Sequence, residues 1–109
     1  MGKRDDIDEL TTLLSLALTH RIGNIVNPDE IYSEKYRKES DVFLKQAVRV
    51  SLRQNWSRSD KIKIRELLER KLRESLEKRN FLDNKKFKFI DREIKRILEL
   101  LELSLSLGH

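Results

Sequence analysis

Cysteine is absent from this chain of 109 residues, and glycine and proline are rare, with three and one respectively. The lack of cysteine excludes disulfide bonds, thiolate ligands for a metal and thiol nucleophiles. The shortage of glycine and proline leaves too few turn residues for the many short strands of a sandwich or barrel. No segment approaches the run of about 20 apolar residues that a membrane-spanning helix needs. These absences favour a helical protein without thiol chemistry.

The amino terminus, MGKRDDIDEL, has no apolar core of signal-peptide length, so we expect a cytoplasmic protein. Charged residues make up 39% of the chain and apolar residues 38%, a balance that suits helices with wide solvated faces. Lys, Arg and Glu are abundant while Asn and Gln are sparse, as in many heat-stable proteins. The length predicts one domain, 1–107, and the Gly and His at 108–109 are typical of an expression-tag remnant.

Apolar residues recur every three or four positions in four segments, which predicts an all-α fold, a single four-helix bundle-like domain. In the first segment, Leu10, Leu14 and Leu18 form one stripe, and Gly23 is expected to end the helix in the left-handed conformation. We expect helices at about 5–22, 28–54, 59–80 and 87–105, joined by short loops.

The second helix has the strongest start signal. In VNPDEI, Asn27 is placed to cap the helix, Pro28 suits its first position and Glu30 completes a capping-box-like pattern. We expect this helix to be continuous or slightly kinked. The alternative is a break near 38–41, where Ser40 caps a second segment.

Residues 81–90 allow one competing fold. NFL and FKFI would pair across DNKK as a small β-hairpin, which would make the protein a winged helix. Only Phe87, Lys88 and Phe89 alternate, and no glycine serves the turn, so the plain bundle is preferred, with 81–86 as a loop.

Charge is distributed unevenly along the chain. Residues 1–34 hold three Lys or Arg against seven Asp or Glu, whereas residues 35–96 hold 21 against 10, a net charge of +11. The total of +5 therefore conceals a strongly basic middle. Such an asymmetry indicates a polyanionic partner.

The expected helix over 28–54 carries bases on one side. They project within about 80° of each other, opposite the stripe that contains Tyr36 and Phe43, and no acid lies inside that arc. An unpaired basic face supplies the salt-sensitive attraction to phosphates in DNA or RNA binding, although it is equally typical of a solvated face of a basic protein. The candidate nucleic-acid contacts are Lys35, Lys38, Lys45, Arg49 and Arg53, with Arg58 and Lys61 as outer contacts.

Trp56 lies at the corner that follows these bases. It either stacks on a base or covers the core with its indole N–H bonded to water or a carbonyl, and the second interpretation is preferred. A helix-turn-helix over 43–65 is a minority alternative, because the connection is long for a tight turn.

Three features raise the question of a metal, a catalytic or a buried polar site. ELLE occurs at 66–69 and 99–102, and Glu-x-x-Glu pairs hold Mg²⁺ in helical nucleotide pyrophosphatases, which the pattern resembles loosely. The first pair points away from the apolar stripe, whereas a bundle metal site needs inward carboxylates. His20 has no second metal ligand and no nucleophile motif beside it. Arg21 falls within the apolar stripe, where it snorkels, pairs with an acid or marks the end of the helix. We expect no enzyme, metal or cofactor.

Leucines at the carboxyl terminus give the last helix two apolar sides. One side meets the core, and the other needs a partner, for which a second copy in a homodimer is the preferred interpretation. The outward residues are Leu100, Leu103 and Leu107.

The sequence therefore predicts a small, non-catalytic helical protein that binds nucleic acid non-specifically through its second helix. The alternative is an adaptor or assembly subunit, a homo-oligomeric helical module whose basic helix docks on an acidic protein. Neither membrane association nor a small-molecule substrate is expected.

Overall fold

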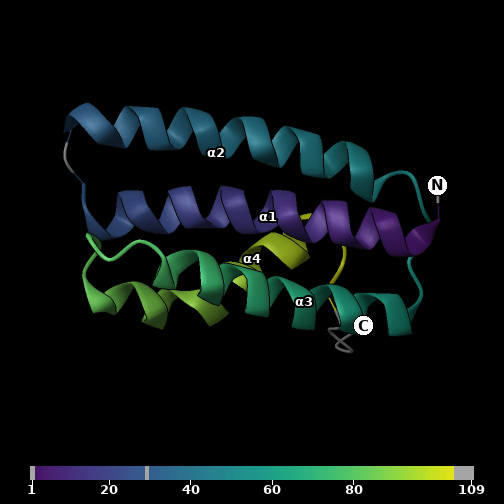
Figure 1. Ribbon diagram of the computed structural model, residues 1–109. Helices are drawn as coiled ribbons and strands as arrows, with labels where there is room; N and C mark the ends of the chain where they lie inside the picture. The colour runs from purple at the N-terminus through teal and green to yellow at the C-terminus, as the bar shows by residue number, and fades with distance from the viewer. Residues whose placement is uncertain (1, 29, 105–109) are drawn as a thin grey trace.

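Helices joined by short connections make up the part of the chain that the structure describes (Figure 1). The computed structural model describes residues 2–28 and 30–104, apart from the side chains of residues 30–33. No residue in these ranges lies in a β-strand, which confirms the all-α, bundle-like prediction. The elements are α1 (Lys3–Val26), α2 (Glu30–Ser51), α3 (Arg58–Glu77), the 3₁₀ helix η1 (Asn84–Phe89) and α4 (Ile90–Leu100).

The segment expected to be a loop or a hairpin contains η1, so the winged-helix alternative is wrong. The Asp83 carboxylate accepts a hydrogen bond from the Lys85 N–H at 2.8 Å, and the Asp83 carbonyl accepts one from the Lys86 N–H at 3.0 Å. A side chain that bonds its own backbone two residues on favours a helical turn over an extended pairing. The last α-helix consequently begins at Ile90 rather than at 87.

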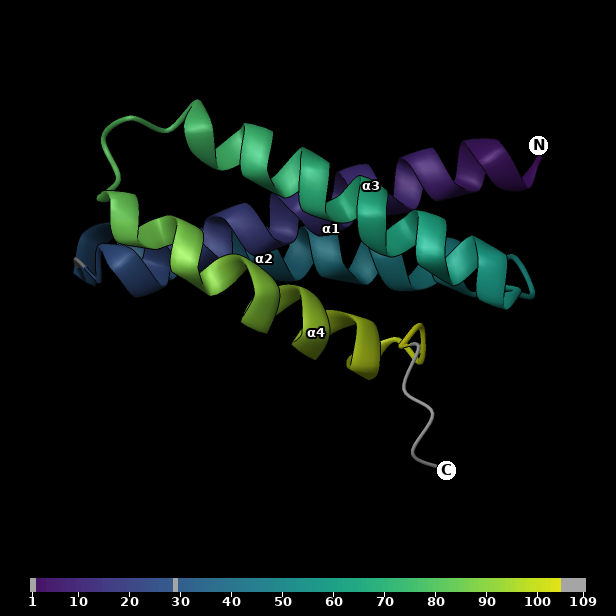
Figure 2. The ribbon, with the colours of Figure 1, turned by 90° about the horizontal axis from the view of Figure 1, so that it is seen from below.

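The first helix, α1, runs through the middle of the bundle, between α2 on one side and α3 on the other (Figure 1). Seen from below, α4 lies beside α3 (Figure 2). A helix with neighbours on several sides must be apolar in several directions, which accounts for the sequence LLSLAL within α1. Two of its buried hydroxyls bond the preceding turn: Thr11 donates to the Ile7 carbonyl and Thr19 to the Ser15 carbonyl.

One continuous core joins the helices. On α3, one leucine or isoleucine per turn is fully enclosed, as the three- and four-residue spacing of apolar residues predicts. The principal core residues are Leu10, Leu14, Leu18, Ile22, Ala47, Val50, Ile64, Leu68, Leu72, Leu76, Ile90, Ile94, Ile97 and Leu98.

Gly23 does not end α1, so that prediction is wrong. The helix continues to Val26, and neither described glycine has a positive φ. Gly23 is buried, and a Cβ at this position would lie 3.8 Å from Leu82 Cδ1 and 4.0 Å from Tyr36 Cε2, which is ordinary contact. Glycine permits a helical backbone as well as a left-handed one, and here packing favours the helix. The Asn27 N–H closes the last turn on the Gly23 carbonyl.

The second helix is continuous, as preferred, but shorter at both ends than expected. Ser40, the alternative cap, instead donates a hydrogen bond of 2.9 Å to the Ala17 carbonyl and so joins α2 to α1. Pro28 precedes the helix rather than opening it, and Asn27 is the C-cap residue of α1. After Ser51 the chain turns, with the Arg53 N–H bonded to the Val50 carbonyl.

The third helix begins with a capping box. The Ser57 hydroxyl accepts from the Asp60 N–H, and the Asp60 carboxylate accepts from the Ser57 N–H. Reciprocal bonds of this kind satisfy two backbone donors that the first turn leaves free. The helix therefore begins at Arg58, close to the expected position, and ends at Glu77 instead of at 80.

The fourth helix ends at Leu100, and the chain then reverses. Glu102 has a φ of 60°, its N–H donates to the Glu99 carbonyl, and the Leu103 N–H donates to the Leu98 carbonyl at 2.7 Å. These two bonds and the left-handed residue form a Schellman motif. The motif turns Leu103 into the core, where it is 2% exposed. The prediction of a helix to 105 with Leu103 facing outward is wrong for this reason.

Glu102→Gly is expected to stabilise the protein by about 1 kcal/mol, because glycine adopts the left-handed conformation without the steric cost of a Cβ. The control is Glu99→Gly, the same substitution inside the last turn of α4, which is expected to cost about 1 kcal/mol. Urea unfolding of both variants measures the difference. A loss of stability in both would contradict the strained-cap explanation.

Candidate nucleic-acid interface

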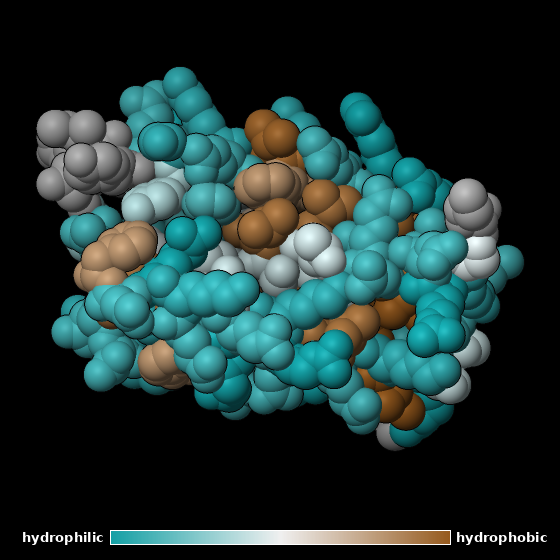
Figure 3. Space-filling view, in the orientation of Figure 1, coloured by the Kyte–Doolittle hydropathy of each residue, from teal (hydrophilic) through white to brown (hydrophobic). Residues whose placement is uncertain are grey.

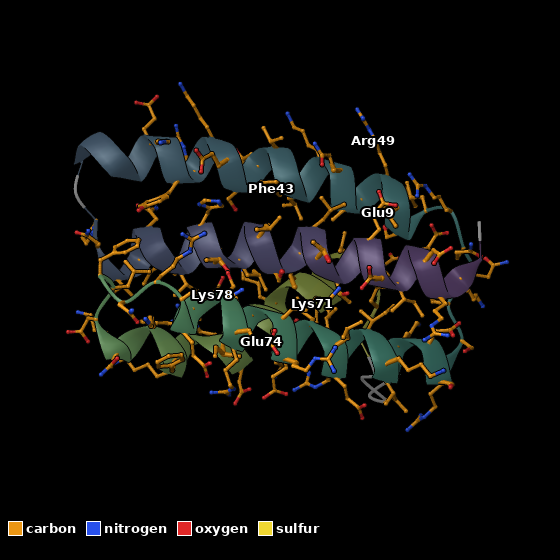
Figure 4. All side chains as sticks on the ribbon, viewed as in Figure 1. Glu9, Phe43, Arg49, Lys71, Glu74 and Lys78 are labelled. Carbon is orange, nitrogen blue, oxygen red and sulfur yellow. The ribbon has the colours of Figure 1, made fainter. Side chains whose placement is uncertain are left out.

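The outward face of α2 carries the bases that the sequence singles out. Because Ala47 and Val50 face the core, the opposite side of this helix is left to solvent. Lys35, Lys38, Lys45 and Arg49 are all exposed. Figure 4 shows Arg49 pointing away from α1. The structure thus brings four of the seven predicted contacts together on one helix.

Two of these four bases have acidic neighbours on their own helix. Lys35 lies 4.0 Å from Glu39, and Lys38 lies 3.5 Å from Glu34. Both acids lie outside the arc of bases, but their ion pairs mean that the basic face is not unpaired at this end of α2. Exposed pairs of this kind contribute little energy and separate easily. Lys45 and Arg49 form no ion pair with any described residue, so the second half of α2 is the less compensated half.

Arg53 does not continue the basic stripe as an unpaired charge. It follows the end of α2, and its Nη1 bonds Asp6 at 3.2 Å and Glu9 at 3.0 Å, both on α1. The hydrogen bonds with Glu9 and Asp6 raise the pKa of Arg53. Helical projection placed this residue on the stripe because the helix was expected to reach 54.

The corner between α2 and α3 is tied to the acidic start of α1. Gln54 donates to Asp6 at 2.7 Å, and Lys3 lies 2.8 Å from Asp60. The bond from Gln54, supported by Arg53, lowers the pKa of Asp6. The bond from Lys3 lowers the pKa of Asp60 to about 2. Asp6 and Asp60 therefore hold the corner in place against the first turn of α1.

Lys71 is a structural contact that sequence reasoning missed. Its Nζ lies within 2.9 Å of the Asp8 carbonyl and within 2.8 Å of the Asp8 carboxylate and the Thr11 and Thr12 hydroxyls. The hydrogen bond from Lys71 lowers the pKa of Asp8. Figure 4 shows Lys71 between α1 and α3. This positive charge is used inside the bundle and is not available to a polyanion.

The remaining residues of the predicted interface lie on α3. Arg58 is exposed and Lys61 is half-buried, both in the first turns of that helix. Trp56 packs against the core and its indole N–H donates to the Ser51 carbonyl at 2.8 Å. This confirms the preferred interpretation of Trp56 as a cover for the core at the end of α2.

His20 and Arg21 both face other helices. His20 stacks on Phe43 with 5.7 Å between ring centroids, and its Nδ1 lies 3.3 Å from Glu39 Oε2. Burial lowers the pKa of His20. Arg21 forms an ion pair with Glu93 of α4, which decides among the three interpretations of its place in the stripe.

Of the two described residues of the expected self-association surface, one is exposed and the other is buried. Leu100 is 61% exposed, Leu103 belongs to the core, and Leu107 lies outside the described residues. A second apolar face on this helix therefore depends on Leu100 alone among the residues described. Formation of a homodimer through this surface stays a prediction.

No protein-family model, curated protein or solved structure matches this chain. None of the described helices combines the length and the apolarity that a bilayer crossing requires. Across residues 2–28 and 30–104, no group of three or more His, Cys, Asp or Glu side chains could hold a metal ion.

Proposed function

We propose that this protein is a non-catalytic nucleic-acid-binding protein that contacts phosphates through the outward face of α2. The observation that carries the proposal is the exposure of Lys45 and Arg49 without an acidic partner among the described residues. Lys35 and Lys38 extend the same face, and Arg58 and Lys61 are outer contacts. Arg53 is left out of the contact set, because Asp6 and Glu9 neutralise it.

The arrangement favours binding without sequence preference. Lys38 and Arg49 are eleven residues apart on one helix, a distance of about 16 Å, which corresponds to about five nucleotide steps of B-DNA. Lysine and arginine on a smooth helix face neutralise phosphates but do not read base edges. Four such contacts predict a slope of log K against log salt of about −3 to −4.

The test is the double charge reversal K45E/R49E. Binding of labelled generic DNA and RNA oligonucleotides, followed by fluorescence anisotropy over a salt series, is expected to weaken at least tenfold. The salt slope is expected to become shallower by about 2, because two phosphate contacts are lost. Circular dichroism should show an unchanged helical fold, since both side chains are exposed.

The matched control is K63E/R65E, which reverses the same charges at exposed positions on α3. This variant is expected to keep most of the binding, because neither residue lies on α2. A general charge effect would weaken binding in both variants alike. Equal losses in the two variants would contradict a specific role for α2. A folded wild-type protein that ignores both nucleic acids at low salt would remove the proposal altogether.

One observation favours the alternative, an adaptor that docks on an acidic protein. Val42 and Leu52 are exposed near the bases of α2, and a shallow hollow is lined by Lys38, Glu39, Val42 and Phe43. Figure 3 shows apolar surface, in brown, over the middle of α1 and α2. Apolar contacts contribute to protein interfaces more than to phosphate binding. If wild-type protein binds neither nucleic acid, this second function is the one to pursue.

A further inference from the structure

Three arginines converge on one buried carboxylate where α4 meets α1. Glu93, in the first turn of α4, is 1% exposed. Arg21 of α1 forms an ion pair with its Oε1. From α4 itself, Arg92 Nε lies 3.5 Å from Oε2 and Arg96 Nη1 lies 3.9 Å from Oε1. Arg21, Arg92 and Arg96 together form the arginine cluster.

The arginine cluster carries more positive charge than Glu93 neutralises. No second carboxylate among the described residues forms an ion pair with any of the three arginines, so two positive charges remain uncompensated. The three guanidinium groups hold about fifteen N–H donors, whereas one carboxylate offers about four acceptor positions. The arginine side chains are 40%, 61% and 54% exposed in chain order, so their free donors are open to a solute.

The guanidinium of Arg92 is oriented before any ligand arrives. It lies over the ring of Phe89, with 4.7 Å between its central carbon and the ring centroid, and Glu93 holds it from the side. A stacked, paired guanidinium loses less side-chain freedom when it forms further hydrogen bonds.

We infer that the arginine cluster is a binding site for a phosphate group. Guanidinium forks match phosphate oxygens in geometry, and several forks can bind one phosphate together. A phosphate monoester has a charge of about −1.5 to −2 near neutral pH, which balances the two uncompensated charges of the cluster. The site goes beyond the proposed function, because it is built from other helices and does not involve the face of α2. A phosphodiester of nucleic acid shares this chemistry with one negative charge.

The test is a titration of the wild-type protein with inorganic phosphate at constant ionic strength, followed through the arginine Nε–H signals in NMR spectra. Saturable shifts are expected for Arg21, Arg92 and Arg96 but not for Arg73 on α3. In R92Q/R96Q the affinity is expected to fall at least tenfold. This variant keeps Arg21, so Glu93 retains its partner in the bundle and the fold is maintained.

The matched control is R73Q/K95Q, which removes the same charge elsewhere. Lys95 is two residues from Glu93, so it leaves α4 about 160° away from that side chain. This control is expected to bind phosphate as the wild type does. Equal affinity in R92Q/R96Q and the wild type, or shifts that fail to saturate, would show that the arginine cluster only clamps α1 to α4.

Two further ligands distinguish the sources of the phosphate. A nucleoside monophosphate supplies a monoester, and a short single-stranded oligonucleotide supplies diesters. If the wild-type protein binds one of these two ligands saturably and R92Q/R96Q does not, the inference is supported. The ligand that binds then identifies whether the phosphate is a monoester or a diester. K45E/R49E is expected to keep the response to inorganic phosphate, so failure of the α2 proposal and failure of this one are separable. An absence of saturable binding for all three ligands overturns the inference.

Discussion

Leu14→Ala is expected to destabilise the protein by about 3–5 kcal/mol, because it opens a cavity in the core beside α1, the helix against which α2, α3 and η1 pack. Leu14 is completely buried in α1 and belongs to the single core cluster. A domain of this size has a total stability of about 5–15 kcal/mol, so the loss is a large fraction of the whole. Urea unfolding, read from the shift in midpoint at constant slope, measures it.

The matched control is Leu16→Ala, two residues further along the same helix. Leu16 is only half-buried, and alanine is the stronger helix former, so this change is expected to cost less than about 1 kcal/mol. Both variants replace leucine by alanine on α1, so the difference between them reports how deeply each position is buried. Similar losses at both positions would mean that α1 is not enclosed as the structure has it.

Periodicity predicts most of this fold because the helices are amphipathic in the ordinary way. On α3, one enclosed residue per turn from Ile64 to Leu76 is what a single covered face requires. The central helix, α1, is harder to predict from periodicity, because apolar residues on several of its sides weaken the three- and four-residue pattern. Its length was underestimated for another reason: Gly23 is a stop signal only when the chain needs the left-handed conformation, and here it does not.

The reversal after α4 had no signal in the sequence. A Schellman motif is usually marked by glycine or asparagine at its left-handed position, and this one has Glu102. Without that marker, the leucines beyond Leu100 extend the helical pattern and place Leu103 on the outer side. The error affected function as well as fold, because the expected self-association surface included a residue that lies in the core.

The sequence predicts the arrangement of candidate site residues only where those residues lie on the same helix. The exposed bases of α2 follow from helical spacing, and four of them are where the spacing puts them. Pairs that join distant segments were not accessible in this way. Arg53 meets Asp6, and Arg21 meets Glu93, 72 positions later. Only the packing of α1 against its neighbours shows which bases are neutralised and which are free.

Replacement of Arg21 is expected to cost much more than replacement of its partner. In Arg21→Met, the buried carboxylate of Glu93 keeps only its longer contacts with Arg92 and Arg96, and the expected loss is about 2–3 kcal/mol. In Glu93→Leu, the half-exposed Arg21 can turn to water, so the expected loss is below about 1 kcal/mol.

The double variant R21M/E93L separates this explanation from simple loss of packing. With neither charge present, the expected stability is within about 1 kcal/mol of the wild type, because an apolar pair of similar volume replaces a buried ion pair without loss. The double variant would then be more stable than Arg21→Met alone, which is possible only if the unpaired carboxylate is what destabilises the single variant. Urea unfolding of all four proteins completes the cycle. Strictly additive losses in the free energy of unfolding would contradict the dependence of buried Glu93 on Arg21. They would show that the apolar residues around this ion pair, and not the pair itself, stabilise the contact between α1 and α4.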